Sequence, residues 1–384
     1  MLTKKSKLFA ITGLAILGVG VAWWVVGTPG GWSPDSKGHD QHTSSPSPRI
    51  APPDQVPPAR ANGTRLDLPS DPQSLPELQR KIESLPAAEA VAFIRKFLAI
   101  GRDGDTGLPF EIASDGRLQQ SPTFRTFLLD ALAALDPAAA AEISRDILAT
   151  PTSADEWALA LRNVGRFEDT TQSRDFLRQK TEELIRNPAW QAEPSIGYLN
   201  AFDVLVHTRA TESTPLLSGL IQNKERKDLA HAAFLTLDRL VQQQPVEMLG
   251  QLADDSALQQ SRPEMTAQQF ARADLRDPAQ REIVQSWLLN SARTATELNS
   301  FATTYPNNNQ FVSHNLLTSA APHTGADLAA HDREALDILT SWQDDPAFQP
   351  VAAHLNKMLA RLRSFTSPPP NRASSREPLP DPDR

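Results

Sequence analysis

Hydrophobic and polar positions alternate with the period of an α-helix over most of the chain. Between Phe124 and Leu135, apolar side chains recur at steps of three and four residues, which puts them on one face of a helix. The same spacing returns between Val351 and Leu362. Alanine, leucine, glutamine, glutamate and arginine, which favour helices, fill the positions between. The pattern predicts an all-α body over residues 75–363, built from about fifteen amphipathic helices joined by short loops.

Helix-start signals support this prediction. Ser153 and Glu156 have the spacing of a capping box, in which Glu156 would reach back to the backbone of Ser153. Four other capping side chains are each followed by a proline, which fits the first helical position: Ser121-Pro122, Asp136-Pro137, Asp277-Pro278 and Asp345-Pro346. The predicted helices cover residues 75–84, 87–100, 122–135, 137–149, 154–164, 172–187, 194–206, 212–222, 227–243, 245–253, 263–273, 278–290, 295–303, 310–319, 326–343 and 346–363.

Two of the predicted helices share a sequence pattern. The stretches Asp136–Leu148 (DPAAAAEISRDIL) and Asp277–Leu289 (DPAQREIVQSWLL) both open with Asp-Pro-Ala and carry an isoleucine near the middle. Amphipathic helices joined by short loops pack as antiparallel neighbours, and this echo of a repeat resembles the HEAT-like class of α-solenoids. The resemblance implies stacked antiparallel helix pairs. A compact, irregular helical domain is the alternative.

One stretch departs from the helical pattern. Three glycines lie between residues 101 and 110, and Phe110 and Ile112 then alternate with polar neighbours. Asp115-Gly116 supplies a turn. We therefore expect a short β-hairpin near residues 108–119, inserted between helix pairs.

The glycine-rich stretch also gathers acidic side chains, whose oxygens suit a calcium ion. An EF-hand loop needs a glycine at its sixth position and a glutamate at its twelfth, where this stretch has Leu108 and Ser114. A phosphate-binding loop needs a lysine after its glycines, and none follows here. A structured turn leading to the hairpin is the simplest interpretation, and a partner-binding loop is the functional alternative. The candidate residues of that loop are Asp103, Asp105, Thr106, Phe110 and Glu111.

No other pattern in the sequence specifies a reaction. His314, His323 and His331 are nine and eight residues apart, whereas two metal ligands on one helix face lie four residues apart. The serine elbow Gly-x-Ser-x-Gly is absent. No cofactor and no metal are therefore expected. Four tryptophans at apolar helical positions are expected in the core: Trp157, Trp190, Trp287 and Trp342.

The N-terminus carries a membrane-spanning pattern. Leu8–Val26 is an uncharged apolar run that would be about 28 Å long as a helix, close to the thickness of a bilayer core. The basic tip, residues 1–7, is expected to stay in the cytoplasm, with the rest of the chain exported to the periplasmic or extracellular side. Secretion after cleavage of a signal peptide near Ala22 is the alternative.

Proline-rich flanks bracket the helical body. Residues 27–74 and 364–384 have few apolar side chains, so both are expected to be disordered. The net charge of the chain is −8, and it becomes −11 when Lys4, Lys5 and Lys7 are left out. An acidic exported part argues against a nucleic-acid partner. The chain has no cysteine, which excludes disulfides, thiolate metal sites and a cysteine nucleophile.

These features predict a single-pass envelope protein, held in the membrane by Leu8–Val26, whose exported helical body is a scaffold for another envelope protein or peptide. The alternative function is an envelope hydrolase that acts on cell-wall or glycan material. Such an enzyme would use two carboxylates that only the fold brings together.

Overall fold

The structure is a computed structural model of the 384-residue chain and describes residues 74–310, 315–319 and 324–366. The predicted cytoplasmic tip, the membrane span Leu8–Val26 and nearly all of the two predicted flanks therefore lie outside the described residues. Residues 364–366, which the sequence assigns to the tail, continue the last helix. Within the described part of the chain, no helix combines the length and the apolar character that a membrane span needs.

Helices make up most of the described chain. The first half contains α1 (Leu75–Ser84), α2 (Ala87–Ala99), α3 (Phe124–Leu135), α4 (Pro137–Ile147), α5 (Ala154–Phe167), α6 (Thr171–Arg186), α7 (Pro188–Ala192), α8 (Ile196–Ala201) and α9 (Asp203–Thr208). The second half contains η2 (Thr211–Ser213), α10 (Thr214–Gln222), α11 (Lys227–Gln243), α12 (Pro245–Asp254), α13 (Ser256–Ser261), α14 (Pro263–Phe270), α15 (Pro278–Leu289), α16 (Ala295–Thr304), α17 (Gly325–Gln343), η3 (Pro346–Val351) and α18 (Ala352–Thr366).

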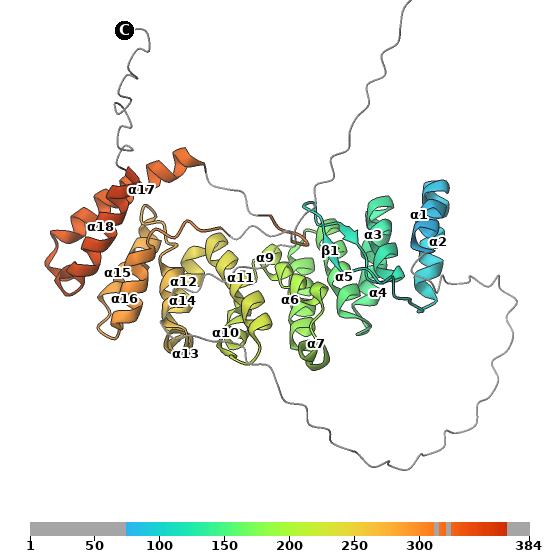
Figure 1. Ribbon diagram of the computed structural model, residues 1–384, viewed down its shortest axis with the longest axis horizontal. Coiled ribbons are helices and arrows are strands. Elements are labelled where there is room, and N and C mark those ends of the chain that lie inside the picture. Colours follow the sequence, from blue (N-terminus) through green and yellow to red (C-terminus); the bar gives the residue numbers. More distant parts are fainter. Residues whose placement is uncertain (1–73, 311–314, 320–323, 367–384) are drawn as a thin grey trace, which may run out of the picture. The chain divides into compact units, whose positions relative to one another are not determined.

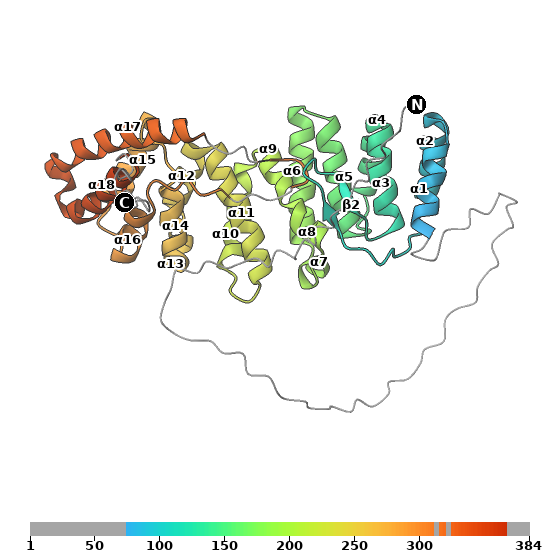
Figure 2. The ribbon, with the colours of Figure 1, turned by 45° about the horizontal axis from the view of Figure 1, so that its top comes forward.

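Successive helices are stacked on one another, as Figure 1 and Figure 2 show. Helix α4 packs against α5, α10 against α11, and α17 against α18. Helices two or three places apart in the chain also pack together, such as α14 with α16 and α5 with α8. This arrangement confirms the predicted all-α fold class. It is compatible with a solenoid-like architecture, in which each helix pair covers the apolar face of the next.

The apolar face predicted for α3 is buried. Phe124, Leu128 and Leu132 have no exposed surface, whereas Leu135 at the end of the helix is 40% exposed. Burying one such side chain contributes about 1.5–3 kcal/mol. The four tryptophans also lie in or against the core: Trp157, Trp287 and Trp342 are buried, and Trp190 is partly buried against it.

The predicted caps are largely confirmed. The carboxylate of Asp136 accepts a hydrogen bond from the N–H of Ala139 at the start of α4 (3.0 Å), and Asp277 and Asp345 cap α15 and η3 in the same way. Two predictions were wrong in detail. Helix α3 begins at Phe124 with Thr123 as its cap, after the predicted Ser121-Pro122. At α5, Ser153 accepts the N–H of Glu156, but the Glu156 carboxylate turns away to Arg125.

Larger differences concern two predicted helices and two short helices that were not predicted. The predicted helix 194–206 is interrupted at Phe202, which separates α8 from α9, and the short helices α7 and α13 were not predicted. The predicted helix 310–319 is wrong where it can be compared, because Gln310 and Asn315–Ser319 are not helical. There, backbone N–H groups bond to a distant side chain instead of closing helical turns.

The predicted hairpin between α2 and α3 is confirmed. Strands β1 (Glu111–Ile112) and β2 (Leu118–Gln120) pair antiparallel. Gly116 turns the chain between them with a φ of +74°, a left-handed conformation that glycine adopts without a steric penalty. The turn ends up beside residues from the far half of the chain.

Buried ion pairs join segments that are neighbours in the helical stack. Each places an arginine against a carboxylate with little exposed surface on either side chain: Arg125–Glu156 (2.5 Å), Arg162–Asp130 (2.6 Å) and Arg272–Asp238 (2.6 Å). Losing one partner of such a pair leaves the other charge buried and unpaired, which costs about 3–5 kcal/mol.

Candidate functional site

Residues Asn315–Ser319, here called the docked segment, lie against helices far from them in the sequence. In Figures 1 and 2 this orange segment between α16 and α17 runs beside α9 and the hairpin. Its backbone bends at Leu316 and Leu317. The surface that receives it, here called the groove, is formed by α5, α9, α11 and the turn of the hairpin.

Asp203, the first residue of α9, is the main anchor of the docked segment. One oxygen of its carboxylate, Oδ2, accepts hydrogen bonds from the backbone N–H groups of Leu317 (2.7 Å) and Thr318 (2.9 Å). The Asp203 side chain is only 4% exposed. Consecutive N–H groups point to opposite sides of a β-strand, so this pair of bonds requires the bend seen here. Because the donors are main-chain groups, the anchor is independent of side-chain identity.

The hydroxyl of Thr318 is held on both sides. It donates a hydrogen bond to Oδ1 of Asp203 and accepts one from Nη2 of Arg239 on α11. Arg239 also donates through Nη1 to the same Asp203 oxygen (2.7 Å). A hydroxyl can donate and accept at once, which an aliphatic side chain of the same shape cannot do. This part of the groove therefore selects a hydroxyl side chain.

Two leucines fill the rest of the groove. Leu316 has no exposed surface, and Leu317 is partly buried against the core. Gly165, inside α5, makes the room for Leu317, because a Cβ atom at this position would lie 2.8 Å from Leu317 Cδ1. The ring of His207 on α9 borders the same space, 3.5 Å from that Cβ position.

The hairpin turn borders the N-terminal end of the docked segment, at Asn315 and Leu316. A Cβ atom on Gly116 would overlap the backbone oxygen of Leu316. Arg166, on α5, donates to the backbone oxygens of both Asp115 and Leu316, the latter at 3.4 Å. Arg162 holds the turn from behind through the oxygen of Gly116 (3.0 Å). The insertion in the helical pattern thus forms one wall of the groove.

A small cavity continues the groove past Asn315. It has a volume of about 190 Å³ and lies between α8, α9 and α11. Leu199, Leu235 and Asp203 are among its lining residues, together with Asn315 itself. A polypeptide bound like the docked segment would have room to extend here.

The imidazole of His207 borders the space that Leu317 enters, so it is the titratable ring at the apolar end of the groove. Burial lowers the pKa of its imidazole, and the carboxylates of Asp203 and Asp169 act in the opposite direction. The nearby Arg174 adds to the lowering. His207 is therefore held neutral to a lower pH than a free histidine.

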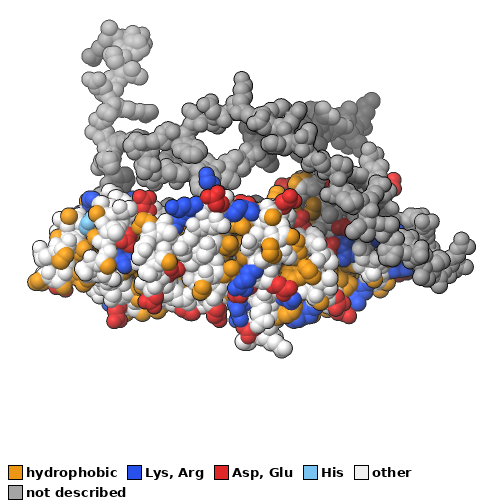
Figure 3. Space-filling model, turned by 90° about the horizontal axis from the view of Figure 1, so that it is seen from below, with side chains coloured by type: hydrophobic (Ala, Val, Ile, Leu, Met, Phe, Trp, Pro, Cys, Tyr) orange, Lys and Arg blue, Asp and Glu red, His pale blue; other side chains and the backbone are white. Residues whose placement is uncertain are grey.

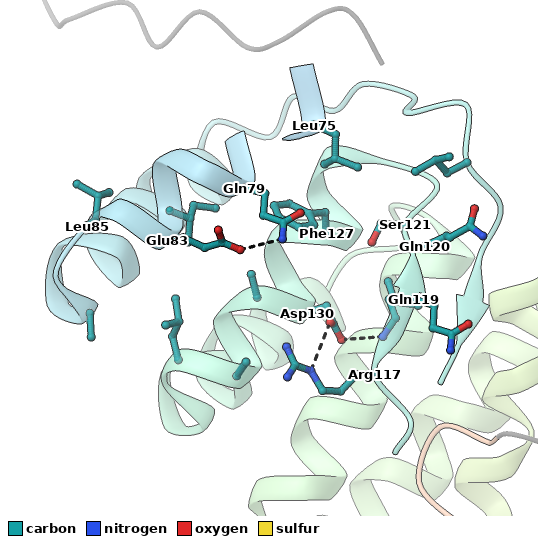
Figure 4. Close-up of a pocket in the computed structure, with 17 residues that line it drawn as sticks. Leu75, Gln79, Glu83, Leu85, Arg117, Gln119, Gln120, Ser121, Phe127 and Asp130 are labelled. Carbon is teal, nitrogen blue, oxygen red and sulfur yellow. Dashed lines mark hydrogen bonds and ion pairs between the residues drawn. The ribbon is translucent and has the colours of Figure 1, made fainter. Parts of the chain in front are cut away.

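A second hollow, here called the open pocket, lies on the other side of the hairpin (Figure 4). Its volume is about 450 Å³, and α1, β2 and α3 form its walls. Figure 4 shows Leu75 and Leu85 on the side of α1, and Phe127 on α3. Most of the lining is aliphatic or aromatic, so the pocket suits apolar side chains of a partner.

Asp130 connects the open pocket to the groove. It lines the pocket on α3, where Arg117 approaches it at 3.9 Å and the N–H of Leu118 donates to it at 3.2 Å (Figure 4). On its other side, Asp130 pairs with Arg162, which in turn holds the oxygen of Gly116. The same charged pair thus supports both hollows.

The residues of the predicted partner-binding loop lie between α2 and the end of β1. Phe110 and Thr106 are buried, Phe110 in the core and Thr106 with its hydroxyl donated to the oxygen of Ser121. The carboxylates of the exposed residues Asp103, Asp105 and Glu111 all accept hydrogen bonds. Asp103 accepts from the N–H groups of Gly104 and of Arg125 in α3, Asp105 accepts from the N–H of Gly107, and Glu111 accepts from the side-chain amide of Gln120. A role for this loop in binding stays a prediction.

The described residues contain no group of histidines and carboxylates arranged to hold a metal ion. Burial raises the pKa of the carboxyls of Asp155 and Asp238. Asp155 accepts hydrogen bonds from Ser195 and the N–H of Gly197, and Asp238 pairs with Arg272. Both thus serve contacts between helices, and neither lines the groove cavity or the open pocket. The predicted hydrolase activity stays a prediction.

Figure 3 shows one face of the molecule, on which basic, acidic and apolar side chains are interspersed. Neither sign of charge dominates that face. The candidate binding surfaces are therefore the two hollows rather than a charged patch on this face.

Comparison with known proteins gives no family for this chain: no family model, no curated protein and no solved structure matches it.

The sequence alone did not reveal Asp203, Arg239 or Arg166 as residues of a site. They lie 36 to 150 residues from the groups they contact, and nothing in their immediate neighbours marks them. One signal was present, because Gly165 lies inside a helical pattern where glycine costs about 1 kcal/mol relative to alanine. A glycine in such a place indicates the close approach of another group.

Proposed function

We propose that this protein is a membrane-anchored, outward-facing helical scaffold of the cell envelope that binds a segment of another protein. The apolar run Leu8–Val26 is the proposed anchor, and the lysines before it favour export of the body. The acidic balance of the exported part favours a protein partner over a nucleic acid.

The docked segment is the main support for this proposal. The helical stack already holds a non-helical piece of polypeptide through main-chain N–H groups, a hydroxyl and two leucines. The same chemistry is suited to a piece of another chain, because short peptides are recognised by main-chain hydrogen bonds together with side-chain pockets. The open pocket adds apolar surface across the hairpin.

We also propose that the stack is of the HEAT-like class of α-solenoids. The two segments that carry the sequence echo, α4 and α15, both begin with an aspartate cap followed by proline. Their equivalent starts support a common repeat unit.

A photo-crosslinking experiment in intact cells tests the function. A photoreactive amino acid is placed at Leu199 or Leu235, which line the groove cavity, and in a matched control at Lys224, an exposed residue between α10 and α11. We expect a specific crosslinked protein from the two groove positions and none from Lys224. The same product from all three positions, or none from any, would contradict the proposal.

A further inference from the structure

We propose that the groove around Asp203 is a binding site for a bent Leu-Leu-Thr or Leu-Leu-Ser segment of a partner protein, and that the docked segment is its built-in competitor. This inference rests on the proposed scaffold function and names the kind of segment that the scaffold takes.

The first support is the arrangement of donors and acceptors. Asp203 is buried, and Arg239 satisfies one of its oxygens from within the helical stack. The other oxygen, Oδ2, receives its two N–H donors from the docked segment. A buried carboxylate is stable when hydrogen-bonded, so the groove holds a place for two consecutive N–H groups. Any polypeptide with the same bend offers them.

The hydroxyl contact supplies the first element of specificity. Thr318 donates to Asp203 and accepts from Arg239, so both faces of its hydroxyl are read. Serine offers the same donor and acceptor, whereas valine offers neither and would leave buried polar groups without partners. A partner must therefore carry threonine or serine at this position.

The two leucines supply the second element. Gly165 keeps a space open inside α5 that Leu317 enters, and Leu316 is fully buried beside the hairpin turn. Both spaces fit an aliphatic side chain of this size, and a charged side chain would be buried without a partner. The order of contacts then reads leucine, leucine, hydroxyl residue.

The docked segment has the properties of a competitor. It is joined covalently to α16 and α17, so it meets the groove at a high effective concentration without needing a high intrinsic affinity. Ser319 is already exposed, and the groove cavity next to Asn315 gives a longer partner further contacts. A partner that uses this extra surface displaces the docked segment.

Peptide binding to the full-length chain in detergent micelles tests the inference. The probe is a fluorescein-labelled peptide of residues 312–321 (VSHNLLTSAA), followed by fluorescence polarisation. The variant Leu316→Ser/Leu317→Ser, here called the groove variant, weakens the docked segment and leaves the residues of the groove itself unchanged. Its matched control, Val246→Ser/Leu289→Ser, removes two exposed apolar side chains from α12 and α15.

We expect the groove variant to bind the probe about tenfold more tightly than the unaltered chain, because the competitor no longer occupies the site. The control should bind like the unaltered chain. Adding Asp203→Asn to the groove variant should abolish the gain. A probe with serine at the threonine position should bind within about threefold, and one with valine about tenfold more weakly. A folded groove variant with unchanged affinity, or equal binding of the valine probe, would overturn the inference.

Hydrogen exchange of the unaltered chain keeps the inference testable if the groove variant does not fold. A detachable segment exposes the amides of Leu317 and Thr318 by local opening, so they should exchange at least about a hundredfold faster than the core amides of α5. Exchange of these two amides at the rate of the core would identify a fixed strut and overturn the inference.

The experiments distinguish a failure of the proposed peptide site from a failure of the proposed scaffold function. A crosslinked envelope partner whose capture does not change when the docked segment is weakened would sink this inference and leave the scaffold function standing. Probe binding that follows the expected pattern, with no crosslinked partner in cells, would contradict the scaffold function and leave the peptide site standing.

Discussion

The groove and the open pocket share one hairpin but are built from different chemistry. The groove holds a buried carboxylate, Asp203, which requires N–H or hydroxyl donors, and the chain supplies them from its own docked segment. The open pocket presents mainly apolar surface, and its polar lining residues, such as Arg117 and Gln119, stand at its walls. A buried charge needs an occupant of defined geometry, whereas apolar walls accept many shapes. The groove is therefore the selective site and the pocket the permissive one.

The largest effect is expected from a substitution that removes the ion pair supporting both hollows. Arg162→Ala leaves Asp130 buried without its main partner and frees the oxygen of Gly116. We expect the free energy of unfolding to fall by about 3–5 kcal/mol, measured by urea denaturation followed by circular dichroism. The matched control is Arg95→Ala, whose pair with Glu142 is exposed on both sides, and it should cost at most about 1 kcal/mol. Equal effects of the two variants would show that the Arg162–Asp130 pair is dispensable.

A smaller effect should separate the two hollows. Leu316→Ala removes a fully buried side chain from the docked segment, and such changes cost about 2–5 kcal/mol in a core. Here the loss falls on docking, so the amides of Leu317 and Thr318 should lose protection from hydrogen exchange. The amides of β2, Leu118–Gln120, belong to the wall of the open pocket and should keep theirs. Loss of protection in β2 as well would mean that the hairpin couples the two sites.

Two glycines provide a test with opposite signs. Gly219 in α10 has open space around a Cβ position, so Gly219→Ala should raise the free energy of unfolding by about 0.5–1 kcal/mol through helix propensity. Gly165→Ala gains the same propensity, but its methyl group meets Leu317 Cδ1 and must push it aside. We expect Gly165→Ala to show no gain, or a loss of about 1 kcal/mol, in thermal unfolding, together with faster exchange in the docked segment. A gain equal to that of Gly219→Ala would show that Leu317 is not held in place.

The sequence predicted the helical stack because its helices carry their own signals. The bounds of α1 and α11 agree with the spacing of apolar positions, and the cap of α4 follows from Asp136 and Pro137. The hairpin was predicted from the turn at Asp115-Gly116. These elements depend on residues close together in the chain, which is why pattern and structure agree.

The groove was not predicted because its contacts are distant in the chain. The apolar residues around Leu316 and Leu317 fit a helical pattern, and the sequence therefore predicts a helix over 310–319. The bonds from Leu317 and Thr318 to Asp203, more than a hundred residues earlier, give the described part a bent conformation instead. A weak local preference was overridden by a buried carboxylate that needs donors.

The smallest expected effect is a pH dependence of the docked segment. Burial lowers the pKa of His207, against the raising influence of Asp203 and Asp169. His207 is therefore protonated less in the docked, folded state than in the unfolded state at pH values between its lowered pKa and about 6.5, the usual pKa of histidine. Stability contributed by the neutral ring is fully present above that pH and is lost as the pH falls through the lowered pKa. His207 borders the space of Leu317, so part of this loss should appear as release of the docked segment.

The measurement is hydrogen exchange of the Leu317 and Thr318 amides at pH 7.5 and 5.5, corrected for the intrinsic exchange rate. We expect protection to fall by about two- to threefold at pH 5.5. His207→Gln should remove this change. His354→Gln serves as the matched control, because burial also lowers the pKa of His354 but the residue lies in α18. A pH effect that disappears in the His354 variant, or persists in the His207 variant, would mean that the groove does not sense the charge of His207. In that case the groove would differ from the open pocket through Asp203 and its hydroxyl contact, with no titratable contribution at its apolar end.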